Sequence, residues 1–204
     1  MIWVFVINNC MAQSKFIQSV LDSAKAESGD SGVKSVNWFR EKIQEFGKPG
    51  PQQLLRDGRR TKGVNFGTLN MFIYSPKHKD TLPYYDTFPL VLPIGPAAGG
   101  FMGLNFHYLP IQMRIRLLDK IVDGGGSLNV AAQSGKSPRL ITDYSQLKRI
   151  PMAKAIVKHY LTGYVKSDFR AITSEELIVA ALLPVQRFQK GSAQAAYLDT
   201  AKRY

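Results

Sequence analysis

The stretch from Asn65 to Pro110 constrains the fold of this chain most, because three short apolar runs in it are separated by turns rich in proline and glycine. Residues 65–74 are aromatic-rich and roughly alternating, and residues 101–108 alternate between two faces. Such alternation predicts β-strands. The prolines in the middle run, residues 88–94, confine that strand to a sheet edge or to bulged geometry. Three short strands with tight turns favour a small, bent antiparallel β-barrel (SH3-like) or meander over a parallel sheet.

Helices are predicted on both sides of this β core, so the expected fold class is α+β. Residues 12–27 and 36–46 carry apolar side chains at helical spacing, and Pro110 begins a further helix in which Arg114 lies off the apolar stripe. A third helix is expected over residues 152–165. Residues 177–185 are predicted to form a final strand, since Pro184 would interrupt a helix.

Composition shifts divide the chain into three parts. We expect an N-terminal arm over residues 1–32, a single α+β domain over 33–190 with its β core at 65–110, and a basic C-terminal tail over 191–204. The apolar run at residues 1–7 is too short to span a bilayer. A buried strand, a weak anchor and an artefact of gene calling all fit it, and we favour the last, with Met11 as the true start.

The balance of charge indicates a polyanionic partner. The sequence has 27 Lys and Arg against 15 Asp and Glu, a net charge of +12. Such an excess favours association with nucleic acid, although a solvated basic surface or an acidic protein partner would also account for it. The single cysteine, Cys10, excludes an intrachain disulfide and a cysteine-based zinc site. No metal or other cofactor is expected.

Catalytic patterns are weak in this chain. It has no G-x-x-x-x-G-K-[ST] stretch, and the glycine-rich run at residues 95–103 joins β-like segments without opening a helix. Asp86 and His107 form the best acid–base pair, but the favoured interpretation is that Asp86 caps a turn and His107 is a satisfied polar group of the core. We therefore predict a protein that is not an enzyme and has no small-molecule substrate.

Two basic groups are the candidate DNA contacts, because Lys and Arg side chains pair with phosphates. One is the turn-rich connector at residues 56–62, for which a solvated loop is an equal alternative. The other spreads over the predicted third helix and its flanks, where Lys154 and Lys158 would share one helix face. Tyrosines among these cations would stack on bases or, alternatively, belong to the core. The predicted contacts are Arg56, Arg59, Arg60, Lys62, Lys148, Arg149, Lys154, Lys158, Lys166 and Arg170.

Several stretches together resemble the T-even-type phage DNA end protector family. They are YSPK at 74–77, LPYYDTFPLV at 82–91 and GFMGLNFHYLP at 100–110, with NWF at 37–39, KHYL at 158–161, and LP at 183–184 followed by RF at 187–188. The resemblance covers residues 33–190 and implies a virion protein without catalytic residues. Such a protein would bind double-stranded DNA ends near the portal or neck, shield them from host exonuclease and aid head–tail joining.

The resemblance also implies partners and a location. We expect contacts with phage portal or head-completion (neck) proteins, a place in the virion head or neck, presence in the host cytoplasm during assembly, and no membrane association. The alternative is a tail or baseplate structural subunit of a contractile-tailed phage without a direct DNA role. A nuclease is the third and weakest hypothesis.

Overall fold

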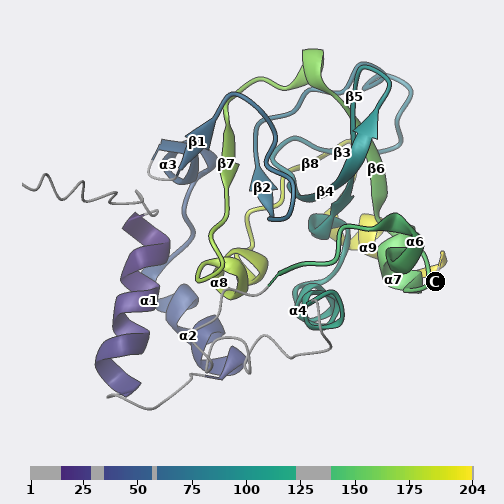
Figure 1. The fold of residues 1–204 in the computed structure, drawn as a ribbon. Helices are drawn as coiled ribbons and strands as arrows, with labels where there is room; N and C mark the ends of the chain where they lie inside the picture. The colour runs from purple at the N-terminus through teal and green to yellow at the C-terminus, as the bar shows by residue number, and fades with distance from the viewer. Residues whose placement is uncertain (1–14, 29–34, 57–58, 123–138, 204) are drawn as a thin grey trace, which may run out of the picture.

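The structure, a computed structural model, describes residues 15–28, 35–56, 59–122 and 139–203, and its centre is an antiparallel sheet (Figure 1). Within these residues the sheet has six strands in the order β1-β7-β2-β4-β5-β6. A separate ladder pairs β3 with β8. The strands are β1 (Arg60–Thr61), β2 (Asn70–Met71), β3 (Tyr85–Asp86), β4 (Leu90–Ala97), β5 (Gly100–Asn105), β6 (Val157–Leu161), β7 (Phe169–Ala171) and β8 (Phe188–Gln189). With helices packed around it, the fold is α+β, as the sequence predicts.

The sheet is open, so the predicted SH3-like barrel is not confirmed. Strands β1 and β6 are its two edges, and they do not pair with each other in the described part of the chain. Closing a barrel requires every strand to pair on both sides in a staggered register. Here β1 has two residues and pairs only with β7, which is too short a ladder to carry the sheet around to β6.

The longest hairpin of the sheet is β4–β5, which lies between β2 and the edge strand β6. The register between these strands shifts between Pro93 and Gly95, which is the bulged geometry that the prolines predict. Strand β6 lies so close to β5 that a Cβ on Gly100 would stand 1.8 Å from the carbonyl oxygen of Tyr160. Only glycine allows this approach of the two backbones.

The sheet separates two apolar clusters. The larger one lies between the sheet and the helices and includes Leu90, Leu104 and Phe106. The smaller one is mostly aromatic and joins Phe72, Tyr74, Val91, Phe101, Tyr160 and Phe169. Phe72 makes edge contacts with Tyr74, Phe101 and Tyr160 at centroid distances of 5.4–6.1 Å. The alternation of strand β5, with Phe101 on one face and Leu104 on the other, therefore separates these two cores.

Helices cover the larger cluster on one side of the sheet (Figure 1). Ser35 caps the second of them by accepting a hydrogen bond from the backbone N–H of Trp38 at 3.1 Å. The described helices are α1 (Lys15–Ser28), α2 (Val36–Phe46), α3 (Pro51–Arg56), α4 (Ile111–Lys120), α6 (Tyr144–Leu147), α7 (Pro151–Ala155), α8 (Leu177–Leu182) and α9 (Ala193–Ala201), with 3₁₀ turns η2 (Phe106–Tyr108) and η4 (Thr162–Tyr164).

Two predicted elements are wrong. The expected helix over residues 152–165 ends at Ala155, and β6 follows because residues 157–161 pair with the exposed edge of β5. The expected strand over residues 177–185 is helix α8. Pro184 does not interrupt it, because the helix ends at Leu182 and Leu183 adopts the extended conformation that the residue before a proline prefers.

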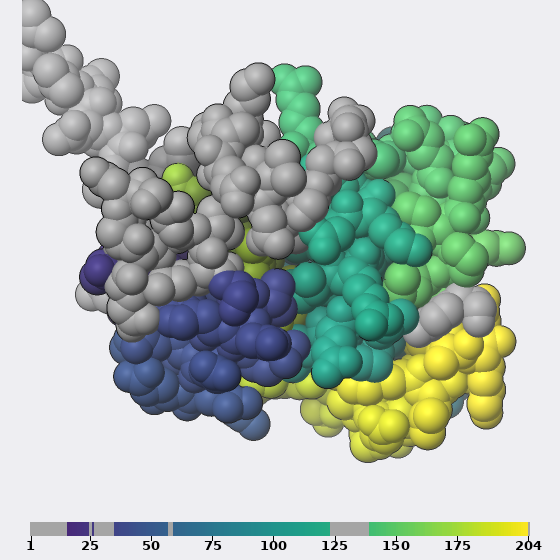
Figure 2. All heavy atoms as spheres, turned by 90° about the horizontal axis from the view of Figure 1, so that it is seen from below, coloured from purple at the N-terminus to yellow at the C-terminus, as the bar shows by residue number. Residues whose placement is uncertain are grey.

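The C-terminal helix α9 packs against η2 and α7. Figure 2 shows this last segment, in yellow, on the surface beside α4, in teal. Two side-chain contacts attach it: the Tyr84 hydroxyl donates to Asp199 at 2.5 Å, and Arg114 donates to the Tyr197 hydroxyl at 3.2 Å. The placement of Arg114 off the buried stripe of α4 is therefore wrong, because its side chain is fully buried.

Several predictions concern residues outside the described segments. They include the apolar run at residues 1–7 with the proposed start at Met11, and the first three residues of the helix predicted over 12–27. The domain boundaries at residues 32 and 190 stay predictions. No helix in the described segments has both the length and the apolar character needed to cross a membrane.

Candidate nucleic-acid interface

The first basic group lies around edge strand β1. Arg56 ends α3, Arg59 and Arg60 lie at β1, and Lys62 follows it; all four side chains are exposed. The backbone beneath them is held, because the carbonyl of Arg59 accepts a hydrogen bond from the N–H of Ala171 at 3.1 Å. The structure therefore presents these cations from an ordered sheet edge.

The second basic group lies on short helix α7 and on the turn that joins α6 to it, at the other edge of the sheet. Asp143 caps α6 by accepting a hydrogen bond from the N–H of Ser145 at 2.8 Å, and buried Leu147 anchors this helix to the core. Lys148, Arg149 and Lys154 are exposed on the polar side. Because β1 and β6 are opposite edges, the structure keeps these cations apart from those of the first group (Figure 1).

Lys158 does not share a helix face with Lys154, so the predicted i, i+4 pair is wrong. It lies on β6, opposite Gly103 of β5. Its side chain is half-buried, and its ammonium nitrogen is 4.1 Å from the centroid of the Tyr108 ring, a cation–π geometry. Burial and, to a smaller extent, repulsion from Arg203 lower the pKa of Lys158 to about 8, and Asp199 opposes this shift.

Arg170 is a correction to the predicted DNA contacts. Its side chain is 0% exposed, and its guanidinium donates to the carboxylate of Glu176 at 2.7 Å. The second oxygen of Glu176 accepts from the backbone N–H of Thr173 at 3.0 Å. A buried, ion-paired guanidinium cannot reach a phosphate without unfolding its surroundings. Arg170 therefore stabilises the fold.

The remaining predicted cation and the tyrosines fall in different environments. Lys166 is exposed, and its ammonium lies 5.9 Å from the centroid of the half-buried Tyr164 ring. Tyr144 is 43% exposed, whereas Tyr160 is 4% exposed and belongs to the aromatic cluster. The core interpretation is correct for Tyr160.

Asp86 and His107 do meet in the structure. Asp86 Oδ2 lies 2.8 Å from His107 Nδ1, and Asp86 Oδ1 accepts from the backbone N–H groups of Phe88 and Arg187, each at 3.0 Å. Burial lowers the pKa of His107, so the imidazole is neutral at pH 7. Burial alone would raise the pKa of Asp86, but His107 and the two backbone donors lower it.

This pair is part of the core. Both side chains are at most 1% exposed, and among the described residues no hydrogen-bond partner is found for His107 Nε2. Within the described residues, no three His, Cys, Asp or Glu side chains converge as metal ligands would. The interpretation that Asp86 caps a turn is confirmed, whereas the interpretation of His107 as a satisfied polar group of the core holds only for Nδ1.

The sequence did not predict that the C-terminal helix would complete a basic cleft. Arg203 pairs with Asp199 at 2.6 Å, and both lie near Lys158, because their charges act on its pKa. A cleft of about 620 Å³ opens between them and residues 74–86. The sequence places Lys158 and Arg203 45 residues apart and gives no periodic signal that would link them.

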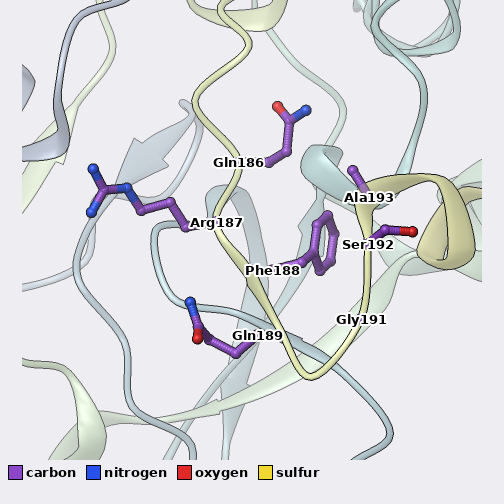
Figure 3. Close-up of a pocket in the computed structure, with 7 residues that line it drawn as sticks. All are labelled: Gln186, Arg187, Phe188, Gln189, Gly191, Ser192 and Ala193. Atoms are coloured by element: carbon purple, nitrogen blue, oxygen red, sulfur yellow. The ribbon is translucent and has the colours of Figure 1, made fainter.

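A second hollow, of about 470 Å³, follows the segment before α9. Figure 3 shows its lining, with Arg187 and Gln189 pointing to one side of the chain and Phe188 to the other. Arg187 is the one charged side chain among its lining residues. The hollow is therefore a weaker candidate than the cleft at Lys158.

These features define a class of protein: a basic α+β chain that presents exposed cations at two edges of an open antiparallel sheet, which suits contact with a polyanion. The comparisons with known proteins agree. Residues 7–200 match the model of the phage T4 terminal DNA protecting protein family, so the chain belongs to that family. No curated protein and no solved structure matched the chain. The family's description refers to protection of DNA termini and not to a reaction.

Proposed function

We propose that this chain is a virion structural protein that binds the ends of double-stranded phage DNA and shields them from host exonuclease. The family match over residues 7–200 carries this proposal. The exposed cations at both sheet edges support it, because phosphate contacts from Lys and Arg supply sequence-independent affinity for DNA. A tail or baseplate subunit without a DNA role is not favoured by that match.

The proposal extends to the place of the protein in the particle. We propose that the protein acts near the portal or neck, contacts head-completion proteins and aids head–tail joining. Assembly would place it first in the host cytoplasm. Fractionated particles test this: the protein should travel with DNA-filled heads, and recovery only with isolated tails would contradict the location.

The DNA-binding surface can be tested with matched pairs of substitutions. Lys148→Gln with Arg149→Gln removes two exposed cations beside β6, and Arg116→Gln with Lys120→Gln removes two exposed cations from α4. Each neutralised phosphate contact should reduce the slope of log K against log salt by about 0.9. We expect the Lys148/Arg149 pair to bind linear duplex more weakly and to reduce the slope of log K against log salt by about 1.8. The Arg116/Lys120 pair on α4 should bind as wild type does.

Protection itself is measured as survival of linear duplex during digestion by a processive exonuclease. Wild-type protein should slow digestion in proportion to occupancy, and the Lys148/Arg149 pair should protect less at equal protein concentration. The proposed function is wrong if the wild-type chain neither binds linear duplex in a salt-dependent way nor slows digestion.

A further inference from the structure

The cleft at Lys158 lies where three distant parts of the chain meet. Residues 74–86 form one wall, β6 contributes Lys158 and His159, and Arg203 closes the side formed by the C-terminal segment. Its volume of about 620 Å³ is within the range of about 300–1,000 Å³ that is typical of ligand pockets. None of the predicted DNA contacts except Lys158 lines it.

Positive charge in the cleft exceeds the negative charge available to balance it. The ammonium of Lys158 and the guanidinium of Arg203 repel each other. Asp199 is engaged by Arg203 at 2.6 Å and by the Tyr84 hydroxyl at 2.5 Å. In the described part of the chain no hydrogen bond or ion pair engages the Lys158 ammonium, whose contact is the Tyr108 ring. Two neighbouring cations with one shared carboxylate favour an anion between them.

The other acidic group of the cleft does not cancel this charge. Asp86 contributes to the lining, but its carboxylate is buried, accepts from His107 and two backbone N–H groups, and is not among the charges that shift the pKa of Lys158. At the rim, Lys77, His78 and His159 are exposed. The ring nitrogen Nε2 of His159 lies 3.1 Å from the carbonyl oxygen of Ala98, so this side chain is held at the mouth of the cleft.

Aromatic side chains supply the second half of the site. The rings of Tyr84 and Tyr108 lie 5.9 Å apart, and Phe188 packs behind both, at 6.1 Å from Tyr84 and 5.1 Å from Tyr108. Tyr84 remains half-buried at the cleft. A base can stack on such a ring at about 1–3 kcal/mol per base. Cations for a phosphate and rings for a base therefore lie side by side.

We propose that this cleft binds the terminal nucleotide of a DNA strand, with its phosphate between Lys158 and Arg203 and its base against the tyrosine-lined wall. The inference rests on the proposed function and deepens it. A cleft of this size admits one splayed nucleotide and not a duplex, and a terminal base leaves its stack at a cost of only a few kcal/mol. The cleft would thus distinguish an end from the interior of the DNA.

The test measures binding of a short single strand that cannot form a duplex. The probe is a 5′-phosphorylated thymidine tetranucleotide labelled at its 3′ end, and its affinity is read by fluorescence anisotropy. Lys158→Met should weaken binding about tenfold, the effect of losing one charge-assisted contact. Lys120→Met removes the same charge from the exposed side of α4, outside the cleft and outside both basic groups, and should weaken binding less than about twofold.

A second pair of variants addresses the C-terminal wall. Arg203→Met removes a cleft cation, and Lys202→Met removes its exposed neighbour on the same segment, which does not line the cleft. Only the first should weaken binding of the tetranucleotide. Urea midpoints equal to wild type would show that both variants are folded, and they are expected because both side chains are exposed.

The outcomes separate this inference from the proposed function. If wild type and Lys158→Met bind the tetranucleotide with equal affinity, the proposal that the cleft binds a terminal nucleotide is wrong. The proposed function still stands in that case if the protein protects duplex ends. Inorganic phosphate should displace the probe less effectively than unlabelled tetranucleotide does, because it has no base to stack. If it displaces the probe equally well, the cleft is a simple anion site, and the proposal that it recognises a nucleotide is wrong. If the wild-type protein does not protect duplex ends, the proposed function is wrong. The tetranucleotide affinities of wild type and Lys158→Met then decide by themselves whether the cleft binds a nucleotide.

Discussion

Replacing buried Arg114 with Met should destabilise the fold strongly. Its guanidinium donates to the carbonyl oxygens of Leu109 and Leu183 at 2.9 and 3.2 Å, and to Gln186 Oε1 and the Tyr197 hydroxyl at 3.1 and 3.2 Å. These bonds join α4 to the segment after α8 and to α9. Burial lowers the pKa of Arg114, and the Tyr197 hydroxyl and Asp86 oppose that shift.

The expected magnitude follows from the partners left behind. Each buried acceptor without its donor costs about 1–3 kcal/mol, so the two carbonyls together cost roughly 2–6 kcal/mol. Removing a buried charge recovers part of this by relieving its desolvation. We expect a net loss of about 3 kcal/mol in the free energy of unfolding. With a urea m-value of about 2–3 kcal/mol/M, the midpoint should fall by about 1 M.

The assay is equilibrium urea unfolding followed by circular dichroism. Arg116→Met, two residues further along α4 and exposed, is the matched control and should change stability by no more than about 0.5 kcal/mol. Arg114→Lys should fall between the two, since an ammonium cannot reach all four acceptors at once. A wild-type midpoint for Arg114→Met would refute the reasoning that these bonds hold α4, α8 and α9 together.

Two further predictions concern the sheet and the core pair. Gly100→Ala should lower the melting temperature by several degrees or prevent folding, because its Cβ would meet the Tyr160 carbonyl oxygen at 1.8 Å. Gly163→Ala, which has open space around the new Cβ, should melt as wild type does. Equal melting temperatures of the two variants would contradict the close approach of β5 and β6. The urea midpoint should also fall as the pH drops below about 6.5. The folded pKa of His107 lies below its unfolded value of 6.5, so the unfolded chain binds the extra proton and acid favours it. Below the unfolded Asp pKa of 3.8 the unfolded chain also binds a proton at Asp86, whose pKa is lowered in the fold, and this should add to the effect. A flat midpoint between pH 7 and 5 in wild type would argue against a buried neutral His107.

Local signals in the chain predicted a large part of the fold. The α+β class, the β4–β5 hairpin with its proline bulge, and the alternation of Phe101 and Leu104 between two faces all follow from spacing and from proline and glycine chemistry. Helices α1, α2 and α4 follow from apolar periodicity. The exposed positions of Arg59, Arg60, Lys148 and Arg149 follow from their polar, turn-rich surroundings.

Segments with mixed preferences were predicted wrongly. Residues 157–161 have helical spacing of Val157 and Tyr160, yet they form β6 because the open edge of β5 offers backbone hydrogen bonds. Residues 177–182 are rich in β-formers and alanine, yet they form α8 because a helix there fills the larger core. In both places packing outweighed local propensity.

Residue chemistry and periodicity along the chain were sufficient to predict a basic α+β protein and its surface cations, because those properties depend on near neighbours. The cleft could be known only from the tertiary structure. Lys158, Tyr108 and Arg203 meet because β6 pairs with β5 and α9 packs beside η2. Contacts between residues so far apart leave no pattern in one sequence. The same is true of Arg170 and Arg114. The sequence predicts both as surface cations, but both are buried, because the tertiary structure places hydrogen-bond acceptors around each guanidinium.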